Sequence, residues 1–122
     1  MAFEALPGWE EGVVEQLQRL LRPALLFNIG IRIEEDLFLA EERNHPYNRY
    51  IEALENIRQL LDFGVEDPIG FYISLLDTPI KDRLTWVMQQ GKLLHEERQP
   101  AFLRTFALSN STLRQPARVV RR

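Results

Sequence analysis

The sequence predicts an all-α fold, a compact bundle of about five to six helices followed by a flexible basic C-terminal tail. Apolar residues recur at offsets of three and four along most of the chain, as they do on one face of a helix. Several of these stretches begin with a residue followed by proline, a common start of a helix. At 122 residues the chain is the size of one domain. We assign residues 1–109 to the helical domain and residues 110–122 to the tail.

The composition excludes several kinds of protein. The sequence has no cysteine, which excludes disulfide bonds, thiolate metal sites and cysteine nucleophiles. No apolar run reaches the roughly 18 residues that a membrane-spanning helix requires. The first residues also lack the basic and then apolar pattern of a secretion signal. We therefore expect no membrane partner and a cytoplasmic location.

The first predicted helix covers residues 9–22. Acidic residues stand in its first turn and arginines in its last, which is the polarity that the helix dipole favours. Pro23 then either kinks a longer helix or begins the next one. The apolar side chains that share one face of this helix are Trp9, Val13, Leu17, Leu20 and Leu21.

The second predicted helix, Pro23–Arg43, contains the most apolar run of the chain, and we expect the fold to be built around it. Arg32 and Asp36 form an i,i+4 pair of opposite charge on its polar side, which favours a helix. Apolar and polar residues also alternate over residues 27–33, as in a β-strand, with a hairpin turn at residues 34–36. That alternative would make the fold α+β.

The third predicted helix begins at Pro46 and carries a regular apolar stripe. We expect Gly64 to end it in a left-handed conformation, with Val65 packed against Leu60 in a Schellman motif. The stripe consists of Tyr47, Tyr50, Ile51, Leu54, Ile57 and Leu61.

A short helix is predicted over residues 68–76, directly after Asp67. Asp67 is a favourable cap, and the following proline suits the first helical position. The segment is apolar on nearly every side, so we expect it to be buried.

Two further helices follow from the same kind of start. One begins at Thr78-Pro79 and runs to about Arg98, with Gly91 on its apolar face. We expect Gly91 to let another backbone approach, and the alternative is that it marks a break in the helix. The last begins at Gln99-Pro100 and ends in the turn-forming residues 109–112.

Few residues are arranged as a catalytic or metal site requires. Neither His45 nor His95 is placed beside a nucleophile motif. Glu42 and His45 form one Glu-x-x-His pair, whereas carboxylate metal sites in helical bundles use two such pairs and further glutamates. We therefore predict no catalytic residue, no metal site, no cofactor and no enzymatic activity.

The aromatic residues fit either a hydrophobic core or a cofactor pocket, and their helical spacing favours the core. Trp9 fits a packing role or a contact with another chain equally well. The aromatic residues concerned are Tyr47, Tyr50, Phe71, Tyr72, Trp86, Phe102 and Phe106.

Charge is distributed unevenly along the chain. All 18 acidic residues lie between Glu4 and Glu97, whereas six arginines and no acidic residue follow from Arg98 onward. The tail therefore suits a negatively charged partner, either the phosphates of a nucleic acid or the acidic body of a neighbouring copy. A purely solubilising tail is the third interpretation. The candidate contact residues are Arg114, Arg118, Arg121 and Arg122.

Together these observations predict a non-enzymatic interaction or assembly protein, such as an adaptor, an inhibitor or a small complex subunit. We expect it to bind a protein partner through an apolar helical surface and to self-associate. The alternative is a nucleic-acid-associated accessory subunit whose arginine-rich tail contacts phosphates.

Overall fold

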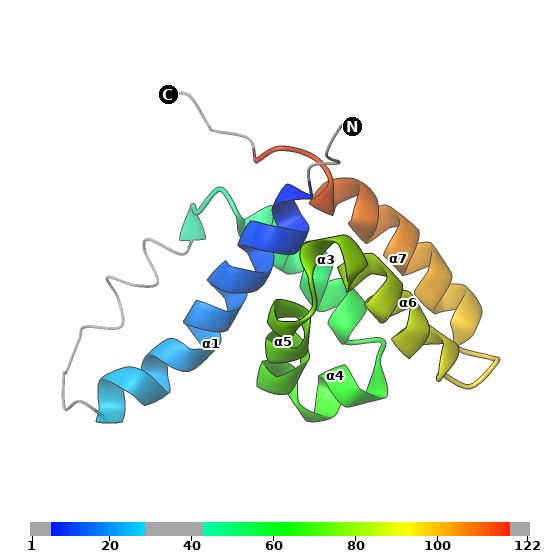
Figure 1. Cartoon of the computed structure of the whole chain (residues 1–122), viewed down its shortest axis with the longest axis horizontal. Helices are drawn as coiled ribbons and strands as arrows, with labels where there is room; N and C mark the ends of the chain where they lie inside the picture. Colours follow the sequence, from blue (N-terminus) through cyan, green and yellow to red (C-terminus); the bar gives the residue numbers. More distant parts are fainter. Residues whose placement is uncertain (1–5, 29–42, 118–122) are drawn as a thin grey trace.

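The computed structural model describes residues 6–28 and 43–117 of the chain (Figure 1). All regular structure within these ranges is helical, which confirms the all-α prediction. In chain order the elements are the π-helical turn η1 (Gly8–Gly12), α1 (Val13–Asn28), α3 (Asn48–Arg58), α4 (Asp62–Glu66), α5 (Pro68–Asp77), the 3-10 turn η2 (Ile80–Asp82), α6 (Arg83–Lys92) and α7 (Gln99–Leu113).

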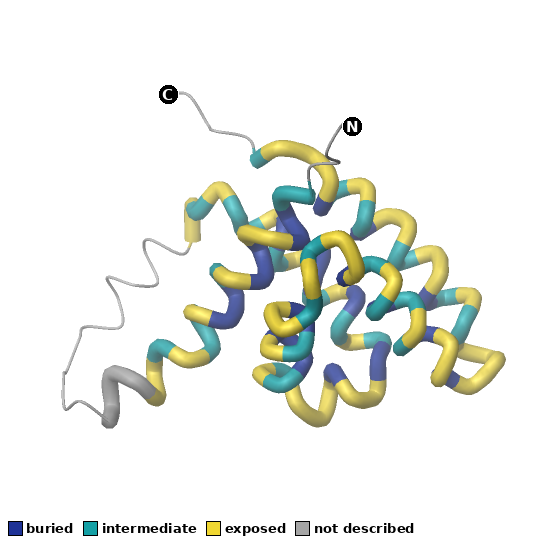
Figure 2. Tube along the Cα trace, in the orientation of Figure 1, coloured by how far each residue is buried: buried dark blue, intermediate teal, exposed yellow. Residues whose placement is uncertain are grey.

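The helices pack around α3 and η1. α3 lies along α7, α1 packs on α5, and η1 contacts α1, α3 and α7 together. One continuous apolar core joins these elements, as the buried stretches in Figure 2 show. Its members are Trp9, Val13, Leu17, Tyr50, Ala53, Leu54, Ile57, Leu61, Phe71, Tyr72, Leu75, Val87, Leu94, Phe102 and Leu113.

The first helix is longer than predicted. α1 runs through Pro23 to Asn28, so of the two alternatives for Pro23 the longer helix is confirmed and the start of a new helix is wrong. A proline inside a helix removes its own N–H bond, here the one to the carbonyl of Arg19, and its ring crowds that carbonyl, but α1 continues beyond it. Residues 23–28 of the predicted central helix therefore belong to α1, while residues 29–42, with most of the proposed strand, lie outside the described ranges.

The prediction that Gly64 ends the third helix is wrong. α3 ends at Arg58, and Gly64 lies buried inside the separate helix α4. A β-carbon at Gly64 would lie 2.6 Å from the carbonyl oxygen of Arg58, so close packing against α3 requires glycine here. Val65 is 55% exposed, so the predicted burial against Leu60 is not observed.

α5 begins as predicted, but it is only partly buried. The Asp67 side chain accepts a hydrogen bond of 2.9 Å from the backbone N–H of Gly70, and Pro68 occupies the first turn. One face of α5 enters the core. Three large apolar side chains on the next face remain exposed, which corrects the expectation that the helix is surrounded: Ile69, Ile73 and Leu76.

α6 ends at Lys92 rather than near Arg98. Gly91 is buried on the expected face, but its neighbour is an aromatic ring instead of a backbone. A β-carbon on Gly91 would lie 2.1 Å from Cε1 of Phe102. The absence of a side chain at Gly91 therefore lets the Phe102 ring lie against α6.

α7 begins at Gln99 as predicted, but residues 109–112 do not end it. The helix continues to Leu113, which is fully buried. A β-carbon on Gly8 would lie 2.6 Å from the Leu113 side chain, so η1 and the end of α7 are in direct contact. This tertiary contact outweighs the turn preference of the Ser-Asn-Ser-Thr sequence.

Trp9 lies within the core of its own chain. The side chain is fully buried, and its indole Nε1 donates a hydrogen bond of 2.9 Å to Oδ1 of Asn110 in α7. The ring also packs on Phe106, with centroids 6.2 Å apart. These contacts support the packing role of Trp9 over the contact with another chain.

Arg83, at the start of α6, is buried and donates hydrogen bonds to three backbone carbonyls. Its guanidinium donates to the carbonyl of Trp9, to the carbonyl of Thr78 at 3.0 Å and to the carbonyl of Leu76 at 3.4 Å. Two of these acceptors lie at the end of α5, where helical carbonyls lack internal partners. Burial lowers the pKa of Arg83, and nearby Glu10 opposes that effect.

We expect Arg83→Met to lower the free energy of unfolding by about 2–3 kcal/mol, because buried carbonyl oxygens lose their charged donor. Urea unfolding followed by circular dichroism measures the change. Arg104→Met on the exposed face of α7 is the matched control and should change stability by less than about 0.5 kcal/mol. Equal losses in both variants would show that Arg83 does not link these segments.

Gly91→Ala should lower the free energy of unfolding by about 1–2 kcal/mol, because overpacking against Phe102 exceeds the gain in helix propensity. In a Phe102→Leu background the same change should be neutral or stabilising, since the ring has been removed. Gln89→Ala on the exposed side of α6 serves as the control. An identical cost of Gly91→Ala in both backgrounds would contradict the ring contact.

Candidate interaction surface

The exposed apolar residues are concentrated on α4 and α5. Among the described residues ten large apolar side chains are exposed, and five of them lie within residues 63–76. We call these five residues the α4–α5 surface: Phe63, Val65, Ile69, Ile73 and Leu76. Figure 2 shows the exposed stretches along these two helices.

The helical periodicity of α5 explains why these side chains line up. Ile69, Ile73 and Leu76 are separated by four and three residues, so they lie along one face of the helix. Their exposed fractions are 36%, 44% and 46%. α4 packs against α5 and carries two more exposed apolar side chains, Phe63 and Val65, at 40% and 55% exposed. Because they are two residues apart in a helix, these two side chains point to different sides of α4. Aliphatic and aromatic side chains exposed together in this way are typical of a protein-binding site.

Acidic residues accompany the α4–α5 surface. Residues 62–77 contain four acidic residues and no basic residue. Asp67 caps α5, and Asp62 forms an ion pair of 2.6 Å with Arg98. Glu66 and Asp77 end α4 and α5, and both are exposed. The surface therefore combines apolar side chains with a negative charge.

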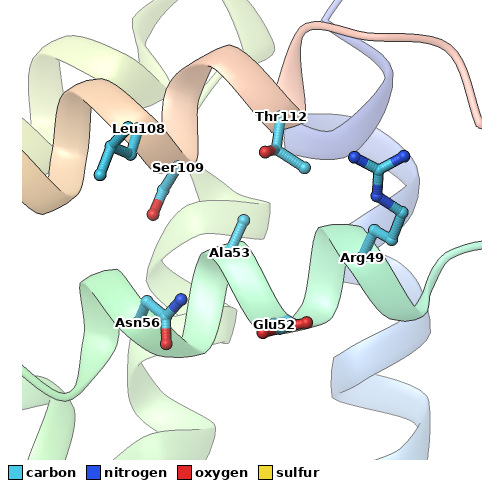
Figure 3. A pocket seen from close by; sticks show the side chains of 7 residues that line it. All are labelled: Arg49, Glu52, Ala53, Asn56, Leu108, Ser109 and Thr112. Atoms are coloured by element: carbon cyan, nitrogen blue, oxygen red, sulfur yellow. The ribbon is translucent and has the colours of Figure 1, made fainter.

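Apart from the α4–α5 surface, a more polar hollow lies between α3 and α7 (Figure 3). Two adjoining openings of about 230 Å³ and about 330 Å³ share three lining residues, Asn56, Leu108 and Ser109. Ala53 and Ser109 point toward each other from the two helices (Figure 3). Five of its ten lining residues carry amides or hydroxyls and two carry charges, while Ala53, Leu60 and the 75% exposed Leu108 are apolar. Its chemistry suits hydrogen bonding more than apolar docking.

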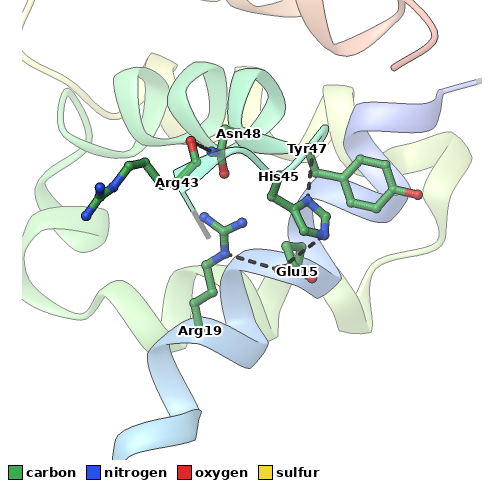
Figure 4. Close-up of polar contacts among 6 residues, drawn as sticks. All are labelled: Glu15, Arg19, Arg43, His45, Tyr47 and Asn48. Carbon is green, nitrogen blue, oxygen red and sulfur yellow. Dashed lines mark hydrogen bonds and ion pairs between the residues drawn. The ribbon is translucent and has the colours of Figure 1, made fainter. Parts of the chain in front are cut away.

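His45 is engaged in a local polar cluster (Figure 4). Its Nδ1 accepts a hydrogen bond of 3.1 Å from the backbone N–H of Tyr47, which places the proton of the neutral ring on Nε2. That Nε2 lies 3.7 Å from Oε1 of Glu15, and Arg19 donates to the same oxygen at 3.1 Å. Asn48 donates to the carbonyl of Arg43 at 3.2 Å. The cluster thus joins the start of α3 to α1.

The proposed Glu-x-x-His pair falls partly outside the described ranges, because Glu42 is not among them. His95 is exposed, and its Nδ1 accepts from the backbone N–H of Glu97 at 3.4 Å. In residues 6–28 and 43–117 no three His, Asp or Glu side chains are grouped as metal ligands.

A polar network lies inside the helical body. Gln16 donates a hydrogen bond of 2.6 Å to Glu55, and Arg58 pairs with the other carboxylate oxygen of Glu55. Arg58 also donates to the carbonyl of Gly64 at 2.8 Å. The network joins α1, α3 and α4, and its groups are used in holding the helices together.

Tyr72 is fully buried next to this network, and its hydroxyl lies near Arg58 but makes no hydrogen bond of good geometry among the described residues. Burial raises the pKa of Tyr72, the charge of Glu55 raises it further, and Arg58 offsets only part of the shift. The aromatic residues proposed as either core or pocket include Tyr72 and lie in or against the core.

The arginine tail is described only at its start. Arg114 is exposed and directly follows α7. Arg118, Arg121 and Arg122 lie outside the described residues, so their binding to phosphate or to an acidic partner stays a prediction. In the described part of the chain no helix is both long enough and apolar enough to cross a membrane.

No protein-family model, curated protein or solved structure matches this chain. The α4–α5 surface was not predicted from the sequence. The apolar pattern of residues 68–76 is the same for a surrounded helix and for one that leaves a second apolar face exposed.

Tyr72→Phe should leave stability near neutral pH unchanged or raise it by up to about 1 kcal/mol, because a buried hydroxyl without a partner is removed. Because the pKa of Tyr72 is higher in the folded than in the unfolded state, its contribution to stability is fully present below the unfolded pKa near 10. This contribution is lost as the pH rises from there through the folded pKa. The wild-type protein should therefore lose more stability between about pH 9.5 and 11 than Tyr72→Phe does.

Tyr47→Phe is the comparison for this experiment, and it should reduce the alkaline loss of stability less than Tyr72→Phe does, because the pKa of Tyr47 is raised less. Tyr47 is half-buried, and its pKa is raised chiefly by a hydrogen bond with Glu11. Thermal unfolding at several pH values measures the stability of the wild type, Tyr72→Phe and Tyr47→Phe. A Tyr72→Phe profile that coincides with the wild-type profile would contradict the assignment.

Proposed function

We propose that this protein is a non-enzymatic interaction or assembly protein that binds another protein through the α4–α5 surface. The observation that carries the proposal is the alignment of Ile69, Ile73 and Leu76 on one exposed face of α5. Removing such side chains from water is the main favourable contribution to most protein associations. Phe63 and Val65 on the neighbouring helix α4 are exposed as well.

The body beneath the surface supports this role because it is rigidly held. The inner face of α5 places Phe71, Tyr72 and Leu75 in the core. Arg83 binds the carbonyl of Leu76 at the end of α5, and Arg58 binds the carbonyl of Gly64 inside α4. A preformed surface loses little conformational entropy on binding, which favours affinity.

The surface should be separable from the fold by mutation. Ile73→Ser and Leu76→Ser replace side chains that are already 44% and 46% exposed, so each should cost no more than about 1 kcal/mol of stability. Leu75→Ala on the buried face should cost about 2–5 kcal/mol. Chemical unfolding of the three variants checks this contrast, and similar costs at all three positions would contradict the assigned faces.

Site-specific photocrosslinking tests the function itself. With a photoreactive phenylalanine analogue at position 73, we expect one protein to crosslink reproducibly and to be identified by mass spectrometry. Leu76→Ser should abolish the crosslink, because the partner loses part of its apolar contact. The same analogue at position 108, an exposed leucine on α7, is the matched control. Crosslinking no stronger at position 73 than at position 108 would sink the proposal.

A further inference from the structure

We propose that the α4–α5 surface binds residues 118–122 of a second copy of this chain. This inference rests on the proposed function, because it takes the α4–α5 surface to be a protein-binding site. It adds the identity of one occupant, and it accounts for the separation of acidic and basic residues along the sequence.

The charge of the surface sets the chemistry of its occupant. Glu66 and Asp77 are exposed at the ends of the two helices that carry the apolar side chains. Because residues 62–77 contain no lysine or arginine, a bound segment meets negative charge on this stretch of chain. A suitable occupant therefore carries apolar side chains flanked by positive charge, since complementary charges fix the register of a complex.

Residues 118–122 of the same sequence have this composition. They read Arg-Val-Val-Arg-Arg, which places two adjacent valines between arginines and includes no acidic residue. Val119 and Val120 match the aliphatic side chains of α5. Arginine forms two-pronged hydrogen bonds with carboxylates, as Glu66 and Asp77 offer.

Chain length makes a second copy the source of this segment. The described chain ends at Ala117, which lines a small hollow with Pro46 and Arg49 beside the start of α3. Three residues beyond Ala117, Val120 lies at most about 11 Å away. From Arg49 to Arg58 α3 alone extends over roughly 14 Å, and α4 begins only after that end. Val119 and Val120 of one copy therefore do not reach α4 of the same copy.

The two binding elements lie on different parts of the chain, so the contact between copies is heterologous. Each copy has one α4–α5 surface and one basic segment. A contact between two copies uses the surface of one and the segment of the other, so each copy can still bind a further copy. Such contacts close into rings or continue as open chains of copies. Association should therefore grow with concentration, and it should weaken with salt as the Debye length falls from about 10 Å at 0.1 M to about 3 Å at 1 M.

A charge-exchange experiment tests the proposal in the full-length chain. The first variant carries Glu66→Lys and Asp77→Lys, and the second carries Arg118→Glu, Arg121→Glu and Arg122→Glu. Sedimentation equilibrium at low salt should show that each variant alone self-associates at least about tenfold more weakly than wild type, because like charges now face each other. An equimolar mixture should recover association, since each reversed element meets an opposite charge. Thermal unfolding confirms that both variants remain folded.

The remaining outcomes are decisive as well. A wild-type protein that stays monomeric at low salt, or variants that associate as wild type does, would overturn the proposal. Binding of the tail to nucleic acid in place of the second copy, seen as salt-sensitive retention of wild type but not of the second variant, would also overturn it. If crosslinking from position 73 identifies a different protein while self-association is absent, the proposed function stands and this inference alone fails.

Discussion

The structure depends on the burial of Trp9 and on the hydrogen bonds that this burial makes possible. The indole of Trp9 donates a hydrogen bond to Asn110 in α7, and the backbone carbonyl of Trp9 accepts one from Arg83 at the start of α6. Residues far apart in the sequence thus meet around one side chain that is completely shielded from solvent. Because polar groups in such a position need partners, the contacts of Trp9 fix the arrangement of η1, α6 and α7 together.

A similar constraint holds the side of the molecule that carries the candidate interaction surface. Glu55 accepts a hydrogen bond from Gln16 of α1 and forms an ion pair with Arg58 of its own helix. Arg58 also donates a hydrogen bond to the backbone of α4. A partly buried ion pair contributes most when its remaining hydrogen bonds are also made, as they are here. The polar network thereby fixes α4 at the end of α3, and the apolar residues of the surface are displayed on an ordered support.

The starts of α5 and α7 were predictable from sequence, because capping and X-Pro geometry depend on a few adjacent residues. Their surroundings were not. Leu113 extends α7 through a turn-forming sequence because it packs on η1, and Gly64 is required by the Arg58 backbone instead of by a helix end. The sequence suggested an apolar binding surface in general terms. Its location on α5 depends on which apolar faces other helices cover, and periodicity does not report this.

The contact between Gly8 and Leu113 brings the two sides of the helical body together at one point. The polypeptide therefore enters this body at Gly8 directly beside the point where α7 ends. A unit with this geometry can be placed within a surface loop of another protein without forcing the host strands apart. The same contact suits circular permutation of the helical body, since Gly8 and Leu113 lie close enough to be joined by a short linker while the chain is opened in another loop.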